Sequence, residues 1–337
     1  MEEIEEAFRD ADPFKTWWPF ILAAIVFVVA TIKSYMGGQH CPNSNKISDL
    51  VVLITGADGG IGSEIVKELA KRGGHIIMCC KNISNGEKVK KKILKYLPKA
   101  RIDVRHLDLR SFDNVRKLVN SIESDYSKVD VLINNAGVTL QPFSKTSDGF
   151  ETHLQVNYLS HFLLTHLLLP LLKHSKHARV INVAAHAYAT GKMNVDDPLR
   201  ISNLAPQFNS RDAFAHSKLA IVMSTKKLAE QLKPISVTVL TPGLVRGTKH
   251  MRQSPIMRAF FAKLIIFPWM WIFMKSPEQG AQTAVFLATE SSISSVTGKY
   301  FNDCEVTDVV ELAKDEHLVN KLYSETLRVL KLEGTKI

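Results

Sequence analysis

Short apolar runs that alternate with amphipathic stretches are the feature that most constrains this chain. From Leu50 onward they recur at the spacing of β-α-β units, at residues 50–55, 75–80, 101–109, 129–137, 178–185 and 235–243. A strand buried on both faces reads as a continuous apolar run, and a sheet of such strands needs helices on both sides. The pattern therefore predicts an α/β fold with a doubly wound parallel sheet, whose last strand lies in "VTGKYFN", residues 296–302.

The N-terminal region contains a segment of a different kind. Residues 17–32, "WWPFILAAIVFVVATI", hold no charged side chain, and their number is at the short end of what spans a bilayer. Two tryptophans stand at one edge, as is typical of membrane interfaces, and the acidic start "MEEIEEAFRD" is unlike a cleaved signal peptide. A polar stretch at 37–46 disfavours the alternative of a buried core helix.

These boundaries predict a tail, an anchor, a linker and one folded domain. The tail covers residues 1–16, the transmembrane anchor 17–32, the linker 33–47 and the domain 48–337. One domain of this length is large enough to bury a substantial core.

Charge and cysteine content limit the partners. The net charge is +10, and much of the excess lies in residues 88–101, "KVKKKILKYLPKAR". Such a run is most often a solvated helix face, with attraction to anionic lipid or to a phosphorylated cofactor as the alternative. No basic–aromatic interleaving or zinc-finger spacing is present, so we expect no nucleic-acid partner. The four cysteines have no metal-ligand spacing, which predicts reduced thiols and no metal site.

A glycine-rich stretch follows the first apolar run. In "TGADGGIG", residues 55–62, Gly56, Gly60 and Gly62 allow the backbone to approach a pyrophosphate at the start of a helix. The glycines alone would also fit a tight turn. Strand, glycines and helix in this order favour a dinucleotide site.

Several motifs in this order resemble the short-chain dehydrogenase/reductase family. They are "TGADGGIG", "NNAG" at 134–137, "QVNYLSHFLLTHLLLP" at 155–170, "RVINVAA" at 179–185, the helix that contains Lys218, and "TPG" at 241–243. "GAQTAVFLATE" at 280–290 and "GKYFNDCEV" at 298–306 look like the membrane-bound retinol dehydrogenase branch. The resemblance covers about residues 50–335. It implies a Rossmann sheet of about seven strands. It also implies hydride transfer between NADP(H) and a lipophilic alcohol or carbonyl.

The resemblance implies a mostly intact cofactor half. The family positions are the phosphate loop (Gly56, Gly60, Ile61, Gly62), the adenine side (Asp108), the ribose side (Asn135, Ala136, Gly137) and the nicotinamide flank (Pro242, Gly243). Lys81 stands where the relatives carry an arginine, and a cation there can pair with a 2′-phosphate, which favours NADP(H). The alternative for Lys81 is a surface lysine. Asp58 departs from the asparagine of the relatives, and its carboxylate is unfavourable near a pyrophosphate.

The catalytic half departs from the family. There a serine and a tyrosine hydroxyl hold the substrate oxygen, a lysine lowers the tyrosine pKa and binds the ribose, and an asparagine supports a water chain. Asn157 and Lys218 match two of these positions, whereas the serine position is Ala185 and the tyrosine position is Phe214. Each loss removes an oxygen and nearly keeps the shape, which predicts impaired proton transfer in a preserved fold. His186 and Tyr188 are the candidates for a substitute proton donor.

Two functions remain open at this point. The first is a membrane-anchored, catalytically impaired protein that binds NADP(H) or a lipid and acts through ligand or partner binding. It would act as a homodimer or as a heterodimer with an active relative. The second is an active NADP(H)-dependent oxidoreductase on a retinoid, a steroid or another lipophilic alcohol or carbonyl, with a rerouted proton donor. Residues 264–274, "LIIFPWMWIFM", fall where relatives form the substrate lid, and are either a second membrane contact or a core helix with a bend at Pro268.

The expected location is the endoplasmic reticulum or a related membrane, crossed once, with the domain in the cytosol. The two sides of the apolar segment carry equal numbers of basic residues, Arg9 and Lys15 before it and Lys33 and Lys46 after it. The distribution of positive charge therefore indicates no orientation in the membrane. Reduced cysteines and an NADP(H) site both suit the cytosol. The acceptor pattern Asn82-Ile83-Ser84 adjoins Lys81, and we expect it to carry no glycan.

Overall fold

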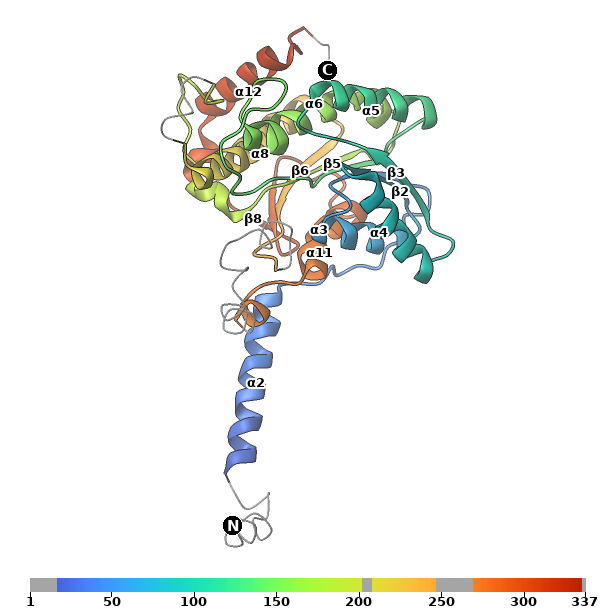
Figure 1. Ribbon diagram of the computed structural model, residues 1–337, viewed down its shortest axis with the longest axis vertical. Helices are drawn as coiled ribbons and strands as arrows, with labels where there is room; N and C mark the ends of the chain where they lie inside the picture. The colour runs from blue at the N-terminus through green and yellow to red at the C-terminus, as the bar shows by residue number, and fades with distance from the viewer. Residues whose placement is uncertain (1–16, 202–207, 247–268, 335–337) are drawn as a thin grey trace.

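The sheet at the centre of the domain sets the position of everything else. The computed structural model describes residues 17–201, 208–246 and 269–334, and within them eight strands pair in the order β3-β2-β1-β4-β5-β6-β7-β8 (Figure 1). The pairs from β3 to β7 are parallel, and β8 pairs with β7 antiparallel. The strands are β1 Val51–Thr55, β2 His75–Cys80, β3 Arg101–His106, β4 Val131–Asn134, β5 Arg179–Val183, β6 Ser236–Thr241, β7 Tyr300–Asn302 and β8 Glu305–Thr307.

Helices cover both faces of this sheet, as its apolar strands require. On one face lie α3 Gly60–Lys71, α4 Ile83–Tyr96 and α11 Pro277–Thr289. On the other lie α5 Phe112–Asp125, α6 Ser160–Leu167, α8 Ser210–Gln231 and α12 Glu316–Leu330. Short elements complete the chain: the π-helical turn η1 Leu154–Leu159, α7 Leu169–Lys173, and the 3₁₀ turns η2 His186–Thr190 and η4 Glu311–Lys314. The predicted doubly wound fold is confirmed.

The last strand pair differs from the expected seven-stranded sheet. The predicted strand at 296–302 is β7 in its last three residues, and a two-residue turn then leads directly into β8. Asp303 and Cys304 form this turn with φ angles of 50° and 66°. A turn of this shape normally contains Asn-Gly or Asp-Gly, so its usual sequence signal is missing here.

The N-terminal apolar segment is a single long helix that projects from the domain. Helix α2 runs over Trp18–Gly37, five residues beyond the predicted end, and its 20 residues correspond to about 30 Å. Large apolar side chains along it, among them Ile21, Ile25 and Phe27, are more than half exposed. Among the described residues it is the one helix long and apolar enough to cross a membrane.

The predicted linker at 33–47 is not a free linker. Its first part continues α2 to Gly37, and residues 38–47, here called the strap, lie along the domain. Cys41 N–H donates to Gln282 Oε1 at 3.0 Å, and the Asn43 side chain donates to Glu290 at 2.8 Å and accepts from Arg72 at 2.7 Å. Polar residues that suggest a solvated linker therefore find partners on α11 and at the end of α3.

The join between α2 and the strap is closely packed at Gly38. This residue has a φ of 69°, and a Cβ atom on it would collide with the Asp303 carboxylate and lie 2.5 Å from Lys275 Nζ. Lys275 is buried and forms an ion pair with Asp303. The exit of α2 is thus held against the end of β7.

We predict that Gly38→Ala loosens the strap. Gly38 has a φ of 69° and a ψ of −178°, a conformation that is essentially restricted to glycine and costs another residue about 1–3 kcal/mol. The contacts with Lys275 and Asp303 add about 1–3 kcal/mol. Gly149→Ala is the matched control, because Gly149 has a φ of 87° and open space around its missing Cβ. Amide exchange of residues 39–47 should accelerate in Gly38→Ala and stay unchanged in Gly149→Ala. Equal exchange in the two variants would contradict the prediction.

Candidate active site

The loop after β1 forms the base of the candidate site. Gly56 has a φ of 62°, and a Cβ atom on it would lie 2.8 Å from Ala136 Cα. A Cβ atom on Gly62, in the first turn of α3, would collide with the Gly56 carbonyl oxygen. These two glycines therefore allow the turn to fold tightly beneath the amino end of α3, whose N–H groups favour an anion.

Thr55 joins this turn to the loop after β4. Its Oγ1 accepts hydrogen bonds from the backbone N–H groups of Asn135 and Ala136, each at 2.9 Å. The Asn135 side chain donates to Thr55 O at 2.9 Å. The two loops thus form one rigid rim at the point where strand order reverses, which is the usual ligand position in such sheets.

A pocket of about 240 Å³ opens along this rim, at the carboxyl ends of β1 to β4. Nine of the residues predicted for the cofactor line it: Gly56, Gly60, Ile61, Gly62, Lys81, Asp108, Asn135, Ala136 and Gly137. Arg110 and Val156 also line it and were missed by the sequence analysis, because no spacing rule singles them out. Pro242 and Gly243 follow β6 and are not among its lining residues.

Lys81 and Asp108 form an ion pair across the mouth of the pocket. Lys81 Nζ lies 3.0 Å from Asp108 Oδ2, and 62% of the Lys81 side chain is exposed. Burial acts to raise the pKa of Asp108, but the Arg110 N–H and Lys81 outweigh it and hold that pKa below its ordinary range. An ammonium has three N–H donors, so Lys81 can bind a phosphate while it contacts Asp108.

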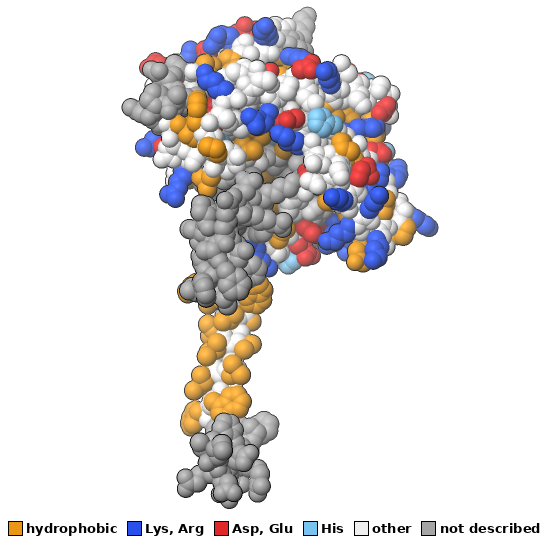
Figure 2. All heavy atoms as spheres, in the orientation of Figure 1, with side chains coloured by type: hydrophobic (Ala, Val, Ile, Leu, Met, Phe, Trp, Pro, Cys, Tyr) orange, Lys and Arg blue, Asp and Glu red, His pale blue; other side chains and the backbone are white. Residues whose placement is uncertain are grey.

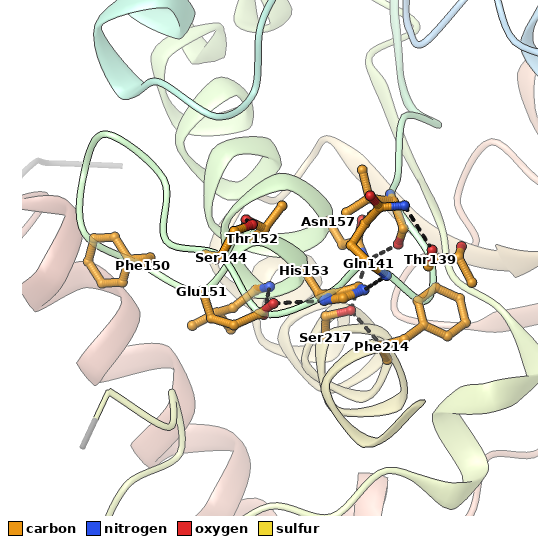
Figure 3. A network of polar contacts seen from close by, with 12 residues as sticks. Thr139, Gln141, Ser144, Phe150, Glu151, Thr152, His153, Asn157, Phe214 and Ser217 are labelled. Carbon is orange, nitrogen blue, oxygen red and sulfur yellow. Dashed lines mark hydrogen bonds and ion pairs between the residues drawn. The ribbon is translucent and has the colours of Figure 1, made fainter. Parts of the chain in front are cut away.

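Asn157 occupies a π-helical turn and is fully hydrogen-bonded (Figure 3). Its Oδ1 accepts from Val138 N–H at 2.8 Å, and its Nδ2 donates to Val138 O at 3.1 Å and to Ser217 Oγ at 2.9 Å. Ser217 Oγ in turn donates to Phe214 O at 2.7 Å. The network ties the loop after β4 to α8, and π turns of this kind are frequent at functional sites.

Lys218 is buried at the carboxyl end of β5. Its Nζ donates to Val183 O at 2.9 Å, and a Cβ atom on Gly137 would lie 3.6 Å from that nitrogen. Burial lowers the pKa of Lys218 to about 8. The ammonium therefore lies beside the loop that lines the pocket.

Phe214 and Ala185 are the residues predicted from sequence at the tyrosine and serine positions of the family. Asn209 caps the start of α8, where its side chain accepts from Arg211 N–H at 2.9 Å. Phe214 and Lys218 both lie in this helix, four residues apart, so Phe214 precedes Lys218 by about one turn. The half-buried Phe214 ring has its centre 5.9 Å from Lys218 Nζ. Ala185 is half-buried two residues past Val183, at the start of η2. Neither side chain can donate or accept a proton.

The candidate substitute donors differ in their surroundings. Tyr188 is buried with its ring 5.1 Å from that of Tyr300, so it faces the core. His186 is exposed on the turn after Ala185.

The sequence analysis did not single out a buried pair beside Phe214. His153 Nδ1 lies 2.7 Å from Glu151 Oε1, and His153 Nε2 accepts from Gln141 N–H at 3.1 Å (Figure 3). Because Nε2 is an acceptor, the ring proton is on Nδ1 and is donated to Glu151. The ring centres of His153 and Phe214 are 6.5 Å apart. Both nitrogens are occupied, so this pair positions the loop around Gln141 and gives no proton to a ligand.

Comparison with known proteins identifies the family. Residues 50–195 match the family model described as short chain dehydrogenase. Retinol dehydrogenase 13 of Homo sapiens is 36% identical over 318 residues, which cover 94% of this chain and 95% of that protein. Retinol dehydrogenase 12 of Bos taurus is also 36% identical, and the match covers 92% of this chain and 95% of that protein. The chain belongs to the short-chain dehydrogenase family. Its predicted likeness to retinol dehydrogenases is confirmed.

Solved structures agree with this family assignment. A crystal structure from Mycobacterium paratuberculosis has a TM-score of 0.67 at 25% identity, and covers 87% of this chain and 98% of its own. The Pseudomonas aeruginosa RhlG/NADP complex has a TM-score of 0.60 at 24% identity, and the match covers 76% of this chain and 95% of that one. The short-chain dehydrogenase fold seen here is therefore shared with both. In this chain the glycine turn and the cation on the rim fit the phosphates of NADP(H).

We predict that Lys81→Ala weakens NADPH binding and leaves NADH binding nearly unchanged. The loss should be about 1–3 kcal/mol, the range for hydrogen bonds to charged groups, because only NADPH carries a 2′-phosphate. Lys67→Ala is the matched control, since Lys67 is 51% exposed and pairs with Glu64 at 2.9 Å. Titration calorimetry with both cofactors measures the effect. Equal weakening of NADPH and NADH binding would show that Lys81 does not contact the 2′-phosphate.

A second prediction concerns the buried ammonium of Lys218. In the unfolded chain its pKa returns to the ordinary value of 10.5, so between about pH 8 and 10.5 the unfolded state binds more protons than the folded state. The free energy of unfolding of the wild type, relative to Lys218→Met, should therefore rise by about 3 kcal/mol across this window, at 1.36 kcal/mol per pKa unit. Denaturant unfolding without cofactor at both pH values measures it. If the difference in unfolding free energy between the wild type and Lys218→Met does not change with pH, the pKa of Lys218 is not lowered in the folded protein.

Proposed function

We propose that this chain is a membrane-anchored, NADP(H)-binding protein of the retinol dehydrogenase type whose proton-transfer step is impaired. It acts by binding a lipophilic ligand or a partner protein. The observation that carries the proposal is the pair Phe214 and Ala185, set around a preserved Asn157–Ser217 network and a preserved Lys218. The pocket lined by the glycine turn and Lys81 supports NADP(H) as the cofactor.

The chemistry of the missing groups gives the size of the impairment. NADP(H), when bound, supplies or accepts a hydride, and a protein group must then exchange a proton with the substrate oxygen. A positioned acid or base contributes about 10²–10⁴-fold and an oxyanion donor about 10²–10³-fold, and such losses are not additive. A combined loss of about 10⁴-fold from a typical kcat of about 10 s⁻¹ leaves about 10⁻³ s⁻¹.

A membrane origin for the ligand is supported by the segment that follows residue 268. Trp269 and Trp271 are 63% and 43% exposed. Lys33 Nζ lies 2.9 Å from the centre of the Trp271 ring, which places this segment against the carboxyl part of α2 (Figure 1). Aromatic side chains beside a membrane helix suit the bilayer interface. The rest of the predicted contact, 264–268, lies outside the described residues.

The proposal extends to location and assembly. The protein crosses a membrane of the endoplasmic reticulum type once through α2, with its domain in the cytosol. The reduced state expected for Cys79, Cys80 and Cys304, which are buried and unbridged, supports a reducing compartment. Its partner is a second copy of the chain or an active relative.

An active oxidoreductase is the second candidate function. Its support is the retention of Asn157 and Lys218, each held by hydrogen bonds beside the pocket. The exposed His186, next to Ala185, is then the proton donor, since Tyr188 is buried against Tyr300.

Restoring both hydroxyls tests the proposal. With NADPH and all-trans-retinal, the wild type should turn over at about 10⁻³ s⁻¹, and Phe214→Tyr combined with Ala185→Ser should raise this at least about 100-fold. Each single change should restore much less, because the two hydroxyls act on one oxygen. Phe143→Tyr with Ala187→Ser adds the same two groups at neighbouring half-buried positions and should have no effect. Robust wild-type turnover that His186→Ala abolishes would instead establish the second candidate.

A further inference from the structure

The lysines of α4 form one continuous exposed surface. Lys88, Lys91, Lys92, Lys95 and Lys99 are all exposed, and their spacing of three and four residues places them on one side of the helix and the turn after it. The opposite side of α4 buries Gly86 and Ile93 against the sheet. These five residues are here called the lysine stripe.

The charges of the lysine stripe are not balanced locally. Within the described part of the chain, none of the five lysines forms an ion pair, whereas Lys67, Lys117 and Lys321 each pair with a carboxylate. Glu87 is the one acidic residue in α4. Like charges three or four residues apart destabilise a helix by about 0.2–0.5 kcal/mol per pair. The lysine stripe is therefore a concentrated positive surface, and the repulsion between its lysines destabilises α4.

The position of α4 brings this surface toward the membrane that α2 would cross. The layer of α3, α4 and α11 lies between the sheet and α2, and the carboxyl end of α4 comes down to the level at which α2 meets the domain (Figure 1). Figure 2 shows Lys and Arg side chains gathered over this region. The strap holds α2 to α11 and the end of α3, so this relative placement is fixed by hydrogen bonds.

An aromatic residue lies within the same surface. Tyr96, at the carboxyl end of α4, is 73% exposed and stands between Lys95 and Lys99 in the sequence. Pro98 beside it is also exposed. Tyrosine is enriched at membrane interfaces, because its ring is apolar and its hydroxyl binds water and headgroups. A solvated helix face gives no reason for this residue, whereas a membrane contact does.

We propose that the lysine stripe and Tyr96 form a membrane contact separate from α2 and from Trp269 and Trp271, and that it binds the anionic phospholipid headgroups of the leaflet into which α2 inserts. A single helix leaves the domain free to tilt and rotate over the bilayer. Attraction between the stripe and anionic lipid removes this freedom and fixes which side of the domain faces the membrane. The inference rests on α2 as the anchor and is independent of whether the site turns over a substrate.

The test uses the full chain in nanodiscs of phosphatidylcholine alone or with phosphatidylserine. The probe is the rate at which an amine reagent modifies each lysine, read by mass spectrometry. Lys91, Lys92, Lys95 and Lys99 should react about fivefold more slowly with phosphatidylserine present, given the attraction of a lysine near an anionic surface. In 1 M salt, where the Debye length is about 3 Å, the difference should disappear. Lys321 lies in α12, Lys331 just after it and Lys314 in the turn η4 just before it. Helix α12 lies on the side of the domain away from α2 (Figure 1), so these three lysines should react equally in both discs.

Variants make the test specific. In Lys91→Gln with Lys92→Gln and Lys95→Gln, phosphatidylserine should no longer slow amide exchange around Tyr96. The matched triple Lys314→Gln, Lys321→Gln and Lys331→Gln should behave as the wild type. Inorganic phosphate added to phosphatidylcholine discs should not reproduce the protection. Equal labelling in both discs, equal slowing at the α12 end, or full protection by phosphate would each overturn the proposal. None of these readouts depends on activity with retinal.

Discussion

The close approach of two loops after β1 and β4 is the constraint on which the rest of the structure depends. Thr55 Oγ1 accepts two N–H groups from the second loop, and Gly56 lets that loop pass where any Cβ atom would meet Ala136. A side chain at Gly56 or Gly62 would separate the loops, because backbone and not a movable side chain is the obstacle. The pocket for a dinucleotide follows from this contact, since its floor, its rim and the amino end of α3 all meet there.

The surroundings of Phe214 and Ala185 show how the fold accommodates side chains without a hydroxyl at these two positions. Asn157 bonds to Ser217 and to the Val138 backbone, Ser217 donates to Phe214 O, and Lys218 donates separately to Val183 O, with no contribution from a hydroxyl at 185 or 214. Leaving a buried polar group unpaired costs about 1–3 kcal/mol. Here neither Asn157 nor Ser217 is left so. A phenyl ring at 214 and a methyl group at 185 bring no further polar atom that needs a partner, so the two side chains fit without breaking this network.

Most of the sheet and most of the pocket could be predicted from sequence, because each depends on local patterns. Continuous apolar runs marked β1 to β6, and glycines after a strand marked the phosphate loop. What could not be predicted depends on contacts between distant residues. The turn at Asp303 lacks glycine yet adopts left-handed backbone, the polar strap finds partners about 240 residues away on α11, and Lys81 pairs with Asp108. None of these has a signal within a short window of sequence.

The anchor and the site are mechanically connected. The strap carries α2 to α11, and the Lys275–Asp303 ion pair lies between Gly38 at the exit of α2 and Gly243 after β6, where a Cβ atom would lie 3.1 Å from Lys275 Cδ. Gly243 has a φ of 75° and follows β6, the strand that packs against α8. Because every step of this path is a packed or hydrogen-bonded contact, it sets the angle at which α2 leaves the domain relative to the carboxyl edge of the sheet.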